Sequence, residues 1–223
     1  MNKSIIRRTI QVGATLMLQA VLLFIAAGTL KWTWAWIFIV TGIMILLINY
    51  LVLPAEVIEE RGKKKENVKK WDRILSGINT VPAILIYLLS GLDFRFGWTG
   101  PVNMAINISG LTFMFAGAML FTWGMVSNRF FSTMVRIQED REHRVATGGP
   151  YRYVRHPGYV GYIVMSAATP LALGSYWALT AAGVSVVLII IRTKLEDDTL
   201  KNELEGYPEY AGQVKKRLIP GVW

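Results

Sequence analysis

In the C-terminal third of this sequence, charged residues flank two neighbouring apolar runs. These residues include both cations and carboxylates, which suits a ligand that carries a positive and a negative charge. Arg155 and His156 stand directly before one run, and Arg192, Glu196 and Asp197 stand directly after the next. Glu196 follows Arg192 by four residues, which places both on one helical face. A cation and a carboxylate side by side can bind a zwitterion, each taking the group of opposite charge. These five residues are therefore candidates for a binding site.

The two apolar runs are predicted to form an antiparallel helical hairpin. They cover residues 158–173 and 176–191, and the turn between them centres on Gly174. His156 lies 18 residues before Gly174 and Arg192 lies 18 residues after it. At equal rise per residue the two should reach the same depth. Each run, at ~24 Å of helix, is shorter than the ~30 Å hydrocarbon core, so we expect the charged ends to be recessed.

A glycine-rich and aromatic segment, residues 147–159, precedes the hairpin. Gly148 and Gly149 permit unusual backbone angles and close approach of a ligand. Pro157 stands where the first turn of a helix is expected, a position that tolerates its missing N–H. The ordinary alternative is a basic, aromatic membrane boundary. The acidic residues predicted to meet this segment favour a ligand site instead.

The elements that hold these residues are predicted to be membrane-spanning helices. The chain has 223 residues, of which 53% are hydrophobic and only 17% charged, and the charges cluster between long apolar runs. About 20 residues of helix cross a bilayer, and unpaired backbone is not tolerated in lipid. Six stretches qualify: 9–30, 33–53, 74–92, 102–126, 158–173 and 176–191. We therefore predict an all-α, polytopic membrane bundle of about six transmembrane helices with a C-terminal cytosolic helical segment.

One membrane domain over residues 1–223 is the simplest organisation, with four N-terminal spans in 1–126. Residues 127–223 would supply the loop, the hairpin and the C-terminal segment. All but two of the 24 Lys and Arg residues, the exceptions being Lys31 and Arg95, lie in alternate connections and in the tails. The positive-inside rule then predicts a cell-membrane protein with both termini in the cytosol. This distribution accounts for the net charge of +9, so a nucleic-acid partner is not expected.

Composition also excludes several kinds of chemistry. The chain has no cysteine, which rules out disulfides, thiolate catalysis and cysteine-bound metal. Its only histidines are His143 and His156, so a multi-histidine metal site is not expected. The first four predicted spans carry no ionisable residue well inside, which argues against an ion-driven carrier.

From about residue 128 to residue 223 the sequence resembles the isoprenylcysteine carboxyl methyltransferase family of membrane enzymes, including its prokaryotic relatives. The resemblance is carried by Gly149-Pro150-Tyr151-Arg152-Tyr153-Val154-Arg155-His156-Pro157-Gly158-Tyr159, by Arg192 with Glu196 and Asp197, and by Gly206-Tyr207, Tyr210 and Arg217-Leu218-Ile219-Pro220. The family usually has two glutamates where this chain has Glu196 and Asp197. The shorter side chain of Asp197 changes its reach but not its charge.

The resemblance implies methyl transfer from S-adenosylmethionine to a lipophilic or membrane-associated acceptor, with a carboxylate favoured. The residues that match the family's cofactor contacts are His143, Val145, Ala146, Gly149, Tyr151, His156, Tyr159, Arg192 and Glu196. The methionine portion of this cofactor is a zwitterion. We expect its carboxylate to meet Arg155 or His156 and its ammonium group to meet Glu196 or Asp197.

Arg192 and Glu196 are the candidate catalytic residues. A carboxylate acceptor needs no general base, and Arg192 would then orient it through two hydrogen bonds. A thiol or amine acceptor would need Glu196 or His156 to take a proton. The sequence leaves O-, N- and S-methylation open. It also allows Arg192 and Glu196 to be a simple surface pair.

Two other functions remain possible from the sequence. Membrane sterol and steroid reductases resemble this family weakly and use NADPH, although no cluster of cations for the 2′-phosphate is evident here. A non-enzymatic accessory protein of the membrane is the other alternative, and it predicts no cofactor affinity.

Overall fold

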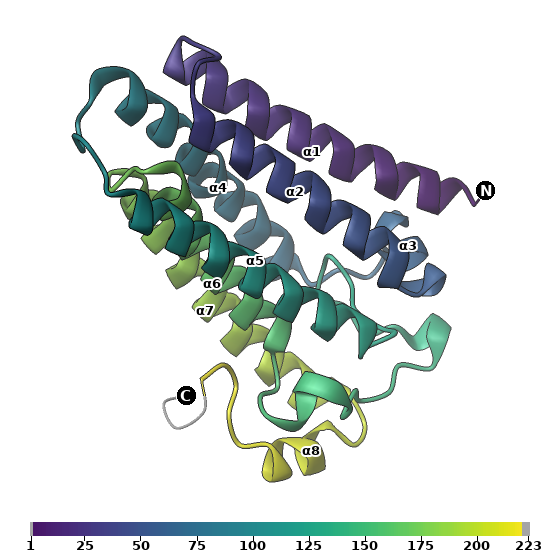
Figure 1. The fold of residues 1–223 in the computed structure, drawn as a ribbon. Coiled ribbons are helices and arrows are strands. Elements are labelled where there is room, and N and C mark those ends of the chain that lie inside the picture. The colour runs from purple at the N-terminus through teal and green to yellow at the C-terminus, as the bar shows by residue number, and fades with distance from the viewer. Residues whose placement is uncertain (1, 220–223) are drawn as a thin grey trace.

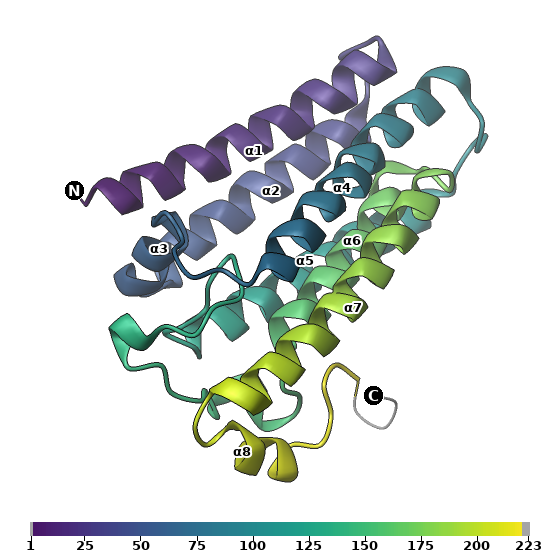
Figure 2. The ribbon, with the colours of Figure 1, turned by 180° about the vertical axis from the view of Figure 1, so that it is seen from behind.

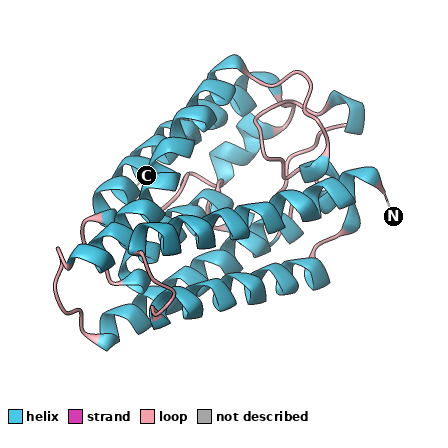
Figure 3. Ribbon diagram, turned by 90° about the horizontal axis from the view of Figure 1, so that it is seen from above, coloured by secondary structure: helices cyan, strands magenta, loops and turns pink. Residues whose placement is uncertain are grey.

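The computed structural model describes residues 2–219, and every regular element in that range is a helix (Figure 3). Pro220 of the tail motif therefore lies outside the described residues. The α-helices are α1 (Lys3–Ala27), α2 (Thr33–Val52), α3 (Ala55–Gly62), α4 (Lys70–Phe96), α5 (Met104–Val126), α6 (Pro157–Leu173), α7 (Ala178–Glu203) and α8 (Tyr207–Gln213). Two short 3₁₀ turns, Glu139–Arg141 and Gly149–Arg152, lie in the loop between α5 and α6.

Within residues 2–219, five helices are long and apolar enough to cross a membrane: α1, α2, α4, α5 and α7. The predicted all-helical, multi-pass architecture is confirmed. The fifth predicted span corresponds to α6, which has 17 residues and falls just short of the usual spanning length. The count of six spans therefore stays a prediction.

Three of the helices run well past the apolar stretches that predicted them. α1 begins at Lys3, α4 begins at Lys70, and α7 continues to Glu203. The last predicted span, 176–191, is thus the apolar part of a longer helix. Hydropathy marks only the part of a helix that suits lipid, whereas Arg192, Lys194 and Glu196, which follow in α7, also have good helix propensity. As a result, Arg192 and Glu196 belong to the same continuous helix as the apolar run.

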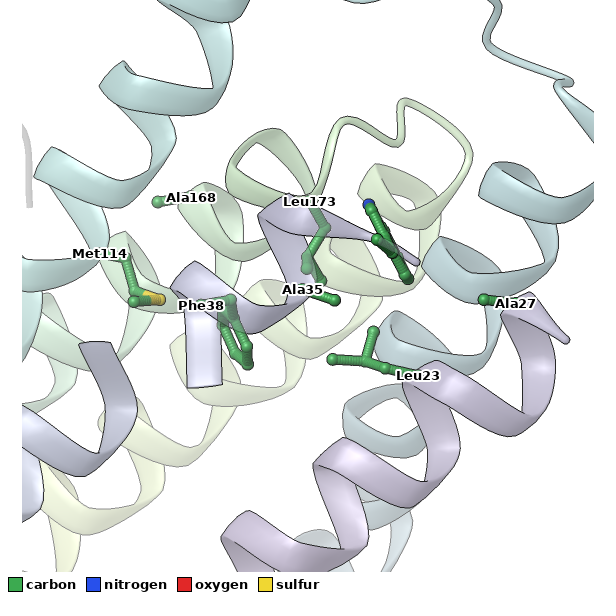
Figure 4. Close-up of a cluster of buried hydrophobic side chains, with 8 residues drawn as sticks. Leu23, Ala27, Ala35, Phe38, Met114, Ala168 and Leu173 are labelled. Carbon is green, nitrogen blue, oxygen red and sulfur yellow. The ribbon is translucent and has the colours of Figure 1, made fainter. Parts of the chain in front are cut away.

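The long helices lie side by side and alternate in direction, as Figures 1 and 2 show from opposite sides. The short helices α3 and α8 and the loop between α5 and α6 gather at one end of this bundle, where α1 also begins. We call this the loop end. The main hydrophobic core lies toward the opposite end and joins α1, α2, α5 and α6 (Figure 4).

Glycines allow α5 and α6 to pack very closely. A Cβ atom built on Gly161 would lie 2.5 Å from the carbonyl oxygen of Gly117, and one built on Gly110 would lie 2.2 Å from the backbone nitrogen of Ala172. Such distances mean that the two backbones are in direct contact, as small residues permit in membrane bundles. This contact fixes α6, and with it the residues at the start of α6.

The turn between α6 and α7 is tied to α4 at the end opposite the loop end. The Ser175 hydroxyl in this turn donates a hydrogen bond of 2.6 Å to the carboxylate of Asp93, which is 2% exposed. The backbone N–H of Thr99 donates to the same carboxylate at 2.7 Å. The hairpin of α6 and α7 is therefore anchored at its tip as well as along α5.

We expect Gly161→Ala to destabilise the bundle, because the added methyl group must push α5 and α6 apart. Overpacking of this kind typically costs roughly 1–3 kcal/mol, or a fall in melting temperature of roughly 2–10 °C for a chain of this size. Gly183→Ala in α7 is the matched control, since a Cβ there meets nothing within 4 Å. Thermal unfolding in detergent, followed by tryptophan fluorescence, measures both. Equal melting temperatures for the two variants would contradict the close packing.

Candidate functional site

A cavity of about 340 Å³ opens at the loop end of the bundle. Its walls come from α3, α4, α5, α6, α7, α8 and the loop between α5 and α6. The volume falls at the small end of the range of cavities that bind cofactors and small ligands. Most of the residues singled out in the sequence lie on these walls: His143, Val145, Ala146, Tyr151, Arg155, His156, Tyr159, Arg192 and Glu196.

Gly149 and Asp197 do not line the cavity. Gly149 has a positive φ of 56°, and a Cβ there would lie 2.2 Å from the hydroxyl oxygen of Ser127 and 3.0 Å from the indole nitrogen of Trp123. Its role is thus to let the loop turn closely over the end of α5. Asp197 is completely buried.

The carboxylate of Asp197 is the centre of a buried ionic cluster. Arg155 donates to it through Nε at 2.6 Å and Nη2 at 2.8 Å, and Arg217 donates through Nε at 2.9 Å. The Tyr207 hydroxyl adds a hydrogen bond of 2.9 Å, and the ammonium group of Lys201 lies 3.1 Å away. Arg155 and Asp197, each predicted as one of two alternative partners for the charged groups of a ligand, therefore bind each other in this structure.

The predicted depth match between His156 and Arg192 is corrected by the structure. His156 lies beside Asp197, with Nε2 3.3 Å from Oδ1, and Asp197 lies more than one helical turn farther along α7 than Arg192. His156 precedes α6 and has a non-helical backbone (φ −127°, ψ 60°), so the assumption of an equal helical rise per residue does not hold there.

Tyr159 joins the two candidate catalytic residues. Its hydroxyl donates a hydrogen bond to Glu196, and the guanidinium carbon of Arg192 lies 5.4 Å from the centre of its ring. Arg192 and Glu196 therefore both face the cavity across the same aromatic side chain. This arrangement offers a ligand one carboxylate and one cation over a short distance.

Asp72, which the sequence analysis did not single out, holds Arg192 in place. The Nε and Nη2 atoms of Arg192 donate to the two carboxylate oxygens of Asp72 at 2.7 and 3.2 Å, and Nη2 also donates to the carbonyl oxygen of Thr133 at 3.2 Å. Asp72 is completely buried and also accepts from the backbone N–H of Val135 at 2.7 Å. The salt bridge of Arg192 is thus to Asp72 on α4 rather than to Glu196. The one available signal was that Asp72 is an acidic residue within a mostly basic stretch, 61–73.

A second buried acid, Glu60 at the end of α3, fixes the loop that covers the cavity. It binds Lys65 at 2.6 Å and Arg136 at 3.2 Å. Burial alone would raise the pKa of the Glu60 carboxyl, but the two cations outweigh it and lower the pKa. Glu60 stays charged at neutral pH and attaches the loop to α3.

The inner end of the cavity is bounded by polar groups within the bundle. The amide of Asn79 donates to the hydroxyl of Tyr162 at 3.0 Å, the Ser185 hydroxyl donates to the Asn79 oxygen at 2.9 Å, and the two hydroxyls lie 3.2 Å apart. Ser185 is seven residues, or roughly 10 Å, from Arg192 along α7. Apolar side chains of Leu75 and Leu188 line the cavity between these levels. The cavity is therefore charged near the loop end, apolar at the level of Leu75 and Leu188, and polar but uncharged at its inner end.

His143 lies on the loop side of the cavity, with its ring 4.6 Å from that of Phe130. Burial, together with nearby Arg136 and Arg141, lowers the pKa of His143 to about 4. The imidazole is therefore neutral at physiological pH. It can contribute an aromatic face and a hydrogen bond to this wall, but no charge.

The fold and this cavity define a multi-pass helical membrane protein with a candidate ligand site at one end of its bundle. Comparison with known families identifies the segment that builds most of the site. Residues 109–202 match the model of the isoprenylcysteine carboxyl methyltransferase (ICMT) family. This match overlaps the segment on which the motifs predicted a resemblance to this family, and we call residues 109–202 the ICMT-family region.

Individual relatives agree with the family match. Residues of this chain are 36% identical over 69 positions to a protein-S-isoprenylcysteine O-methyltransferase of Schizosaccharomyces pombe, which covers 30% of this chain and 29% of that protein. They are 30% identical over 112 positions to protein-S-isoprenylcysteine O-methyltransferase B of Arabidopsis thaliana, or 49% of this chain and 57% of that protein. The chain thus matches less than two thirds of the length of these curated relatives.

Replacing Asp197 by Asn should strongly destabilise the loop end. The substitution keeps the shape but leaves buried Arg155 without its counter-charge, a change that typically costs about 3–5 kcal/mol. Asp198→Asn is the matched control, because that neighbour has a side chain 47% exposed and such substitutions usually change stability by less than about 0.5 kcal/mol. Melting temperatures in detergent compare the two. Similar values would show that the Asp197 cluster does not hold the fold.

His143 should make the protein less stable in mild acid. Its folded pKa of about 4 lies below the unfolded value of about 6.5, so the unfolded chain binds more protons between these values. Stability must then fall as the pH drops from about 6.5 toward 4. His143→Gln removes this contribution, and its melting temperature should fall less between pH 7 and pH 5 than that of the wild type. Parallel pH profiles would contradict the assignment.

Proposed function

We propose that this protein is an S-adenosylmethionine-dependent membrane methyltransferase that methylates a carboxylate on a lipophilic acceptor. The observation that carries the proposal is the distribution of charge in the cavity. Its outer part has a carboxylate, a cation and aromatic rings, and its inner part is uncharged and lined by leucines as well as by the paired polar groups of Asn79 and Tyr162. A charged cofactor and an acceptor with an apolar tail can share such a space, with the reacting atoms where the two parts meet. The ICMT-family region supplies independent support.

The residues on the walls fit the cofactor part by part. Glu196 is the cavity carboxylate that would take the ammonium group, and His156 is the group beside it that would take the cofactor's carboxylate. Val145 and Ala146 pack against the apolar cluster that contains Tyr151, a surface suited to the adenine ring. The aromatic rings next to Glu196 would favour the positive sulfonium.

When bound, the cofactor supplies a methyl group that is already electrophilic. The protein's task is then alignment of the acceptor and exclusion of water. Tyr159 keeps the Glu196 carboxylate in one orientation, and Asp72 keeps Arg192 in one orientation. The loop attached through Glu60 covers the cavity and limits access of water.

A carboxylate acceptor suits this site better than an amine or a thiol. In the transfer, a carboxylate oxygen forms the new bond to carbon, and the electron pair of the broken carbon–sulfur bond stays on sulfur. No proton has to leave, so no general base is needed. His143 is neutral, but it lies on the loop side of the cavity, on a different wall from Arg192 and Glu196. Arg192, which lies over the ring of Tyr159, can orient an anionic acceptor.

The acceptor class follows from the relatives, which are named for action on S-isoprenylcysteine. The inner part of the cavity, between α4, α6 and α7, would hold the start of such an apolar chain. We also propose that the loop end faces the cytosol, since nearly all Lys and Arg residues lie there. The family match does not favour a NADPH-dependent reductase.

The test is cofactor binding and methyl transfer by the purified protein in detergent. We expect binding of S-adenosylmethionine by calorimetry and transfer of a labelled methyl group to N-acetyl-S-farnesylcysteine as a base-labile ester. Glu196→Gln should weaken cofactor binding at least about tenfold, because a charged hydrogen bond is lost.

Glu205→Gln is the matched control, since Glu205 is exposed at the end of α7. It should bind the cofactor as the wild type does. Unchanged affinity in the Glu196 variant would refute the assignment of the ammonium site, and no cofactor binding by the wild type would refute the methyltransferase.

A further inference from the structure

Arg61, in the last turn of α3, projects into the cavity. Its direction is set by its neighbour Gly62, which lies against α1: a Cβ on Gly62 would be 1.9 Å from the carbonyl oxygen of Ser4 and 3.1 Å from the Cβ of Arg8. With Gly62 pressed against α1, the Arg61 side chain extends toward α5 and the following loop. There it meets the rings of Phe121 and Phe131.

Arg61 differs from the other arginines of the cavity in its electrostatic partners. Each of the others lies within salt-bridge distance of a carboxylate: Arg136 of Glu60, Arg144 of Glu142, Arg155 of Asp197, and Arg192 of Asp72. Within residues 2–219, no carboxylate lies within salt-bridge distance of Arg61. The charges that act on it most are those of Arg8 and Arg192.

Such a cation is poorly compensated by the protein alone. Burial, with the two neighbouring arginines, lowers the pKa of Arg61 to about 9, so the group remains charged at neutral pH. A half-buried cation without a counter-charge costs free energy that an anion of suitable shape would recover. The site is therefore electrostatically incomplete without an anionic ligand.

The geometry of the guanidinium suits a carboxylate. Its carbon lies 5.6 Å from the ring centre of Phe121 and 5.3 Å from that of Phe131, which are cation–π distances. Contacts of this kind leave the N–H groups in the plane of the guanidinium available, and these match a carboxylate in a bidentate manner. The same two rings provide an apolar surface next to the charge.

We propose that Arg61 binds the carboxylate of the acceptor and selects anionic acceptors. This inference rests on the proposed function and adds a residue from outside the family-matched segment 109–202. Arg192, whose charge is balanced by Asp72, then serves to orient the acceptor rather than to attract it. The ligand class is a single carboxylate attached to an apolar chain.

The test compares two ligands that differ in charge only. Binding of N-acetyl-S-farnesylcysteine and of its carboxamide is measured by calorimetry in the presence of S-adenosylhomocysteine, which has no methyl group to transfer. We expect the wild type to bind the carboxylate at least about tenfold more tightly, as a bidentate charged pair predicts. Arg61→Gln should bring the two affinities together, and Arg61→Lys should give an intermediate ratio. Arg73→Gln, at an exposed arginine at the start of α4, should retain the wild-type ratio.

Affinity for S-adenosylhomocysteine separates this inference from the proposed function. This affinity should be unchanged in Arg61→Gln, and an unchanged value also shows that the variant is folded. If Arg61→Gln is unstable, Arg61→Lys provides the comparison. A retained preference for the carboxylate in both variants, or no preference in the wild type, would overturn the role of Arg61. If the wild type does not bind S-adenosylhomocysteine but its preference for the carboxylate ligand still depends on Arg61, the methyltransferase is refuted and the anion site at Arg61 is supported.

Discussion

The carboxylate of Asp197 connects the separate pieces of the chain that form the loop end. Arg155 reaches it from the segment before α6, Tyr207 from α8, and Arg217 from the C-terminal tail. A buried charge is stable only when its partners are held around it. The three side chains stabilise the buried charge of Asp197, and the same charge holds the three side chains in place. The cavity next to the cluster has defined walls for this reason, although much of it is built from loops.

The bilayer restricts where such chemistry can lie. Along the spans, polar side chains must find partners within the bundle, as Asn79, Tyr162 and Ser185 do with one another and as Asn107 does with the carbonyl oxygen of Ala172. Charged groups collect at the helix ends instead. A cavity that begins among these charges and extends between the helices is charged at one end and uncharged, with apolar side chains, farther in. Such a distribution suits an amphiphilic ligand.

The two proposed ligands would contact different parts of the chain. The proposed cofactor residues Tyr159 and Glu196 lie in the ICMT-family region, whereas Arg61 and Asp72 lie on α3 and α4, before it. Asp72 bridges the two parts through its bond to Arg192. A common cofactor site can therefore be combined with a separate acceptor site, and differences between acceptors would be expected to arise in the first half of the chain.

Local patterns in the sequence were enough to predict the helices and part of the site. Hydropathy depends on neighbouring residues only, and so does the requirement that backbone groups in lipid be hydrogen-bonded within the helix. The short turn at Gly174, which brings His156 near Asp197, is also a local feature. The partners Asp72 and Arg61 could not be predicted, because 120 positions separate Asp72 from Arg192 and no local rule states which helices pack together. The same limit applies to Arg155 and Asp197: the sequence indicated that opposite charges meet, but only the packed structure decided that these two side chains bind each other. A buried charge takes whichever partner lies nearest in three dimensions, and that is determined by the arrangement of the whole bundle.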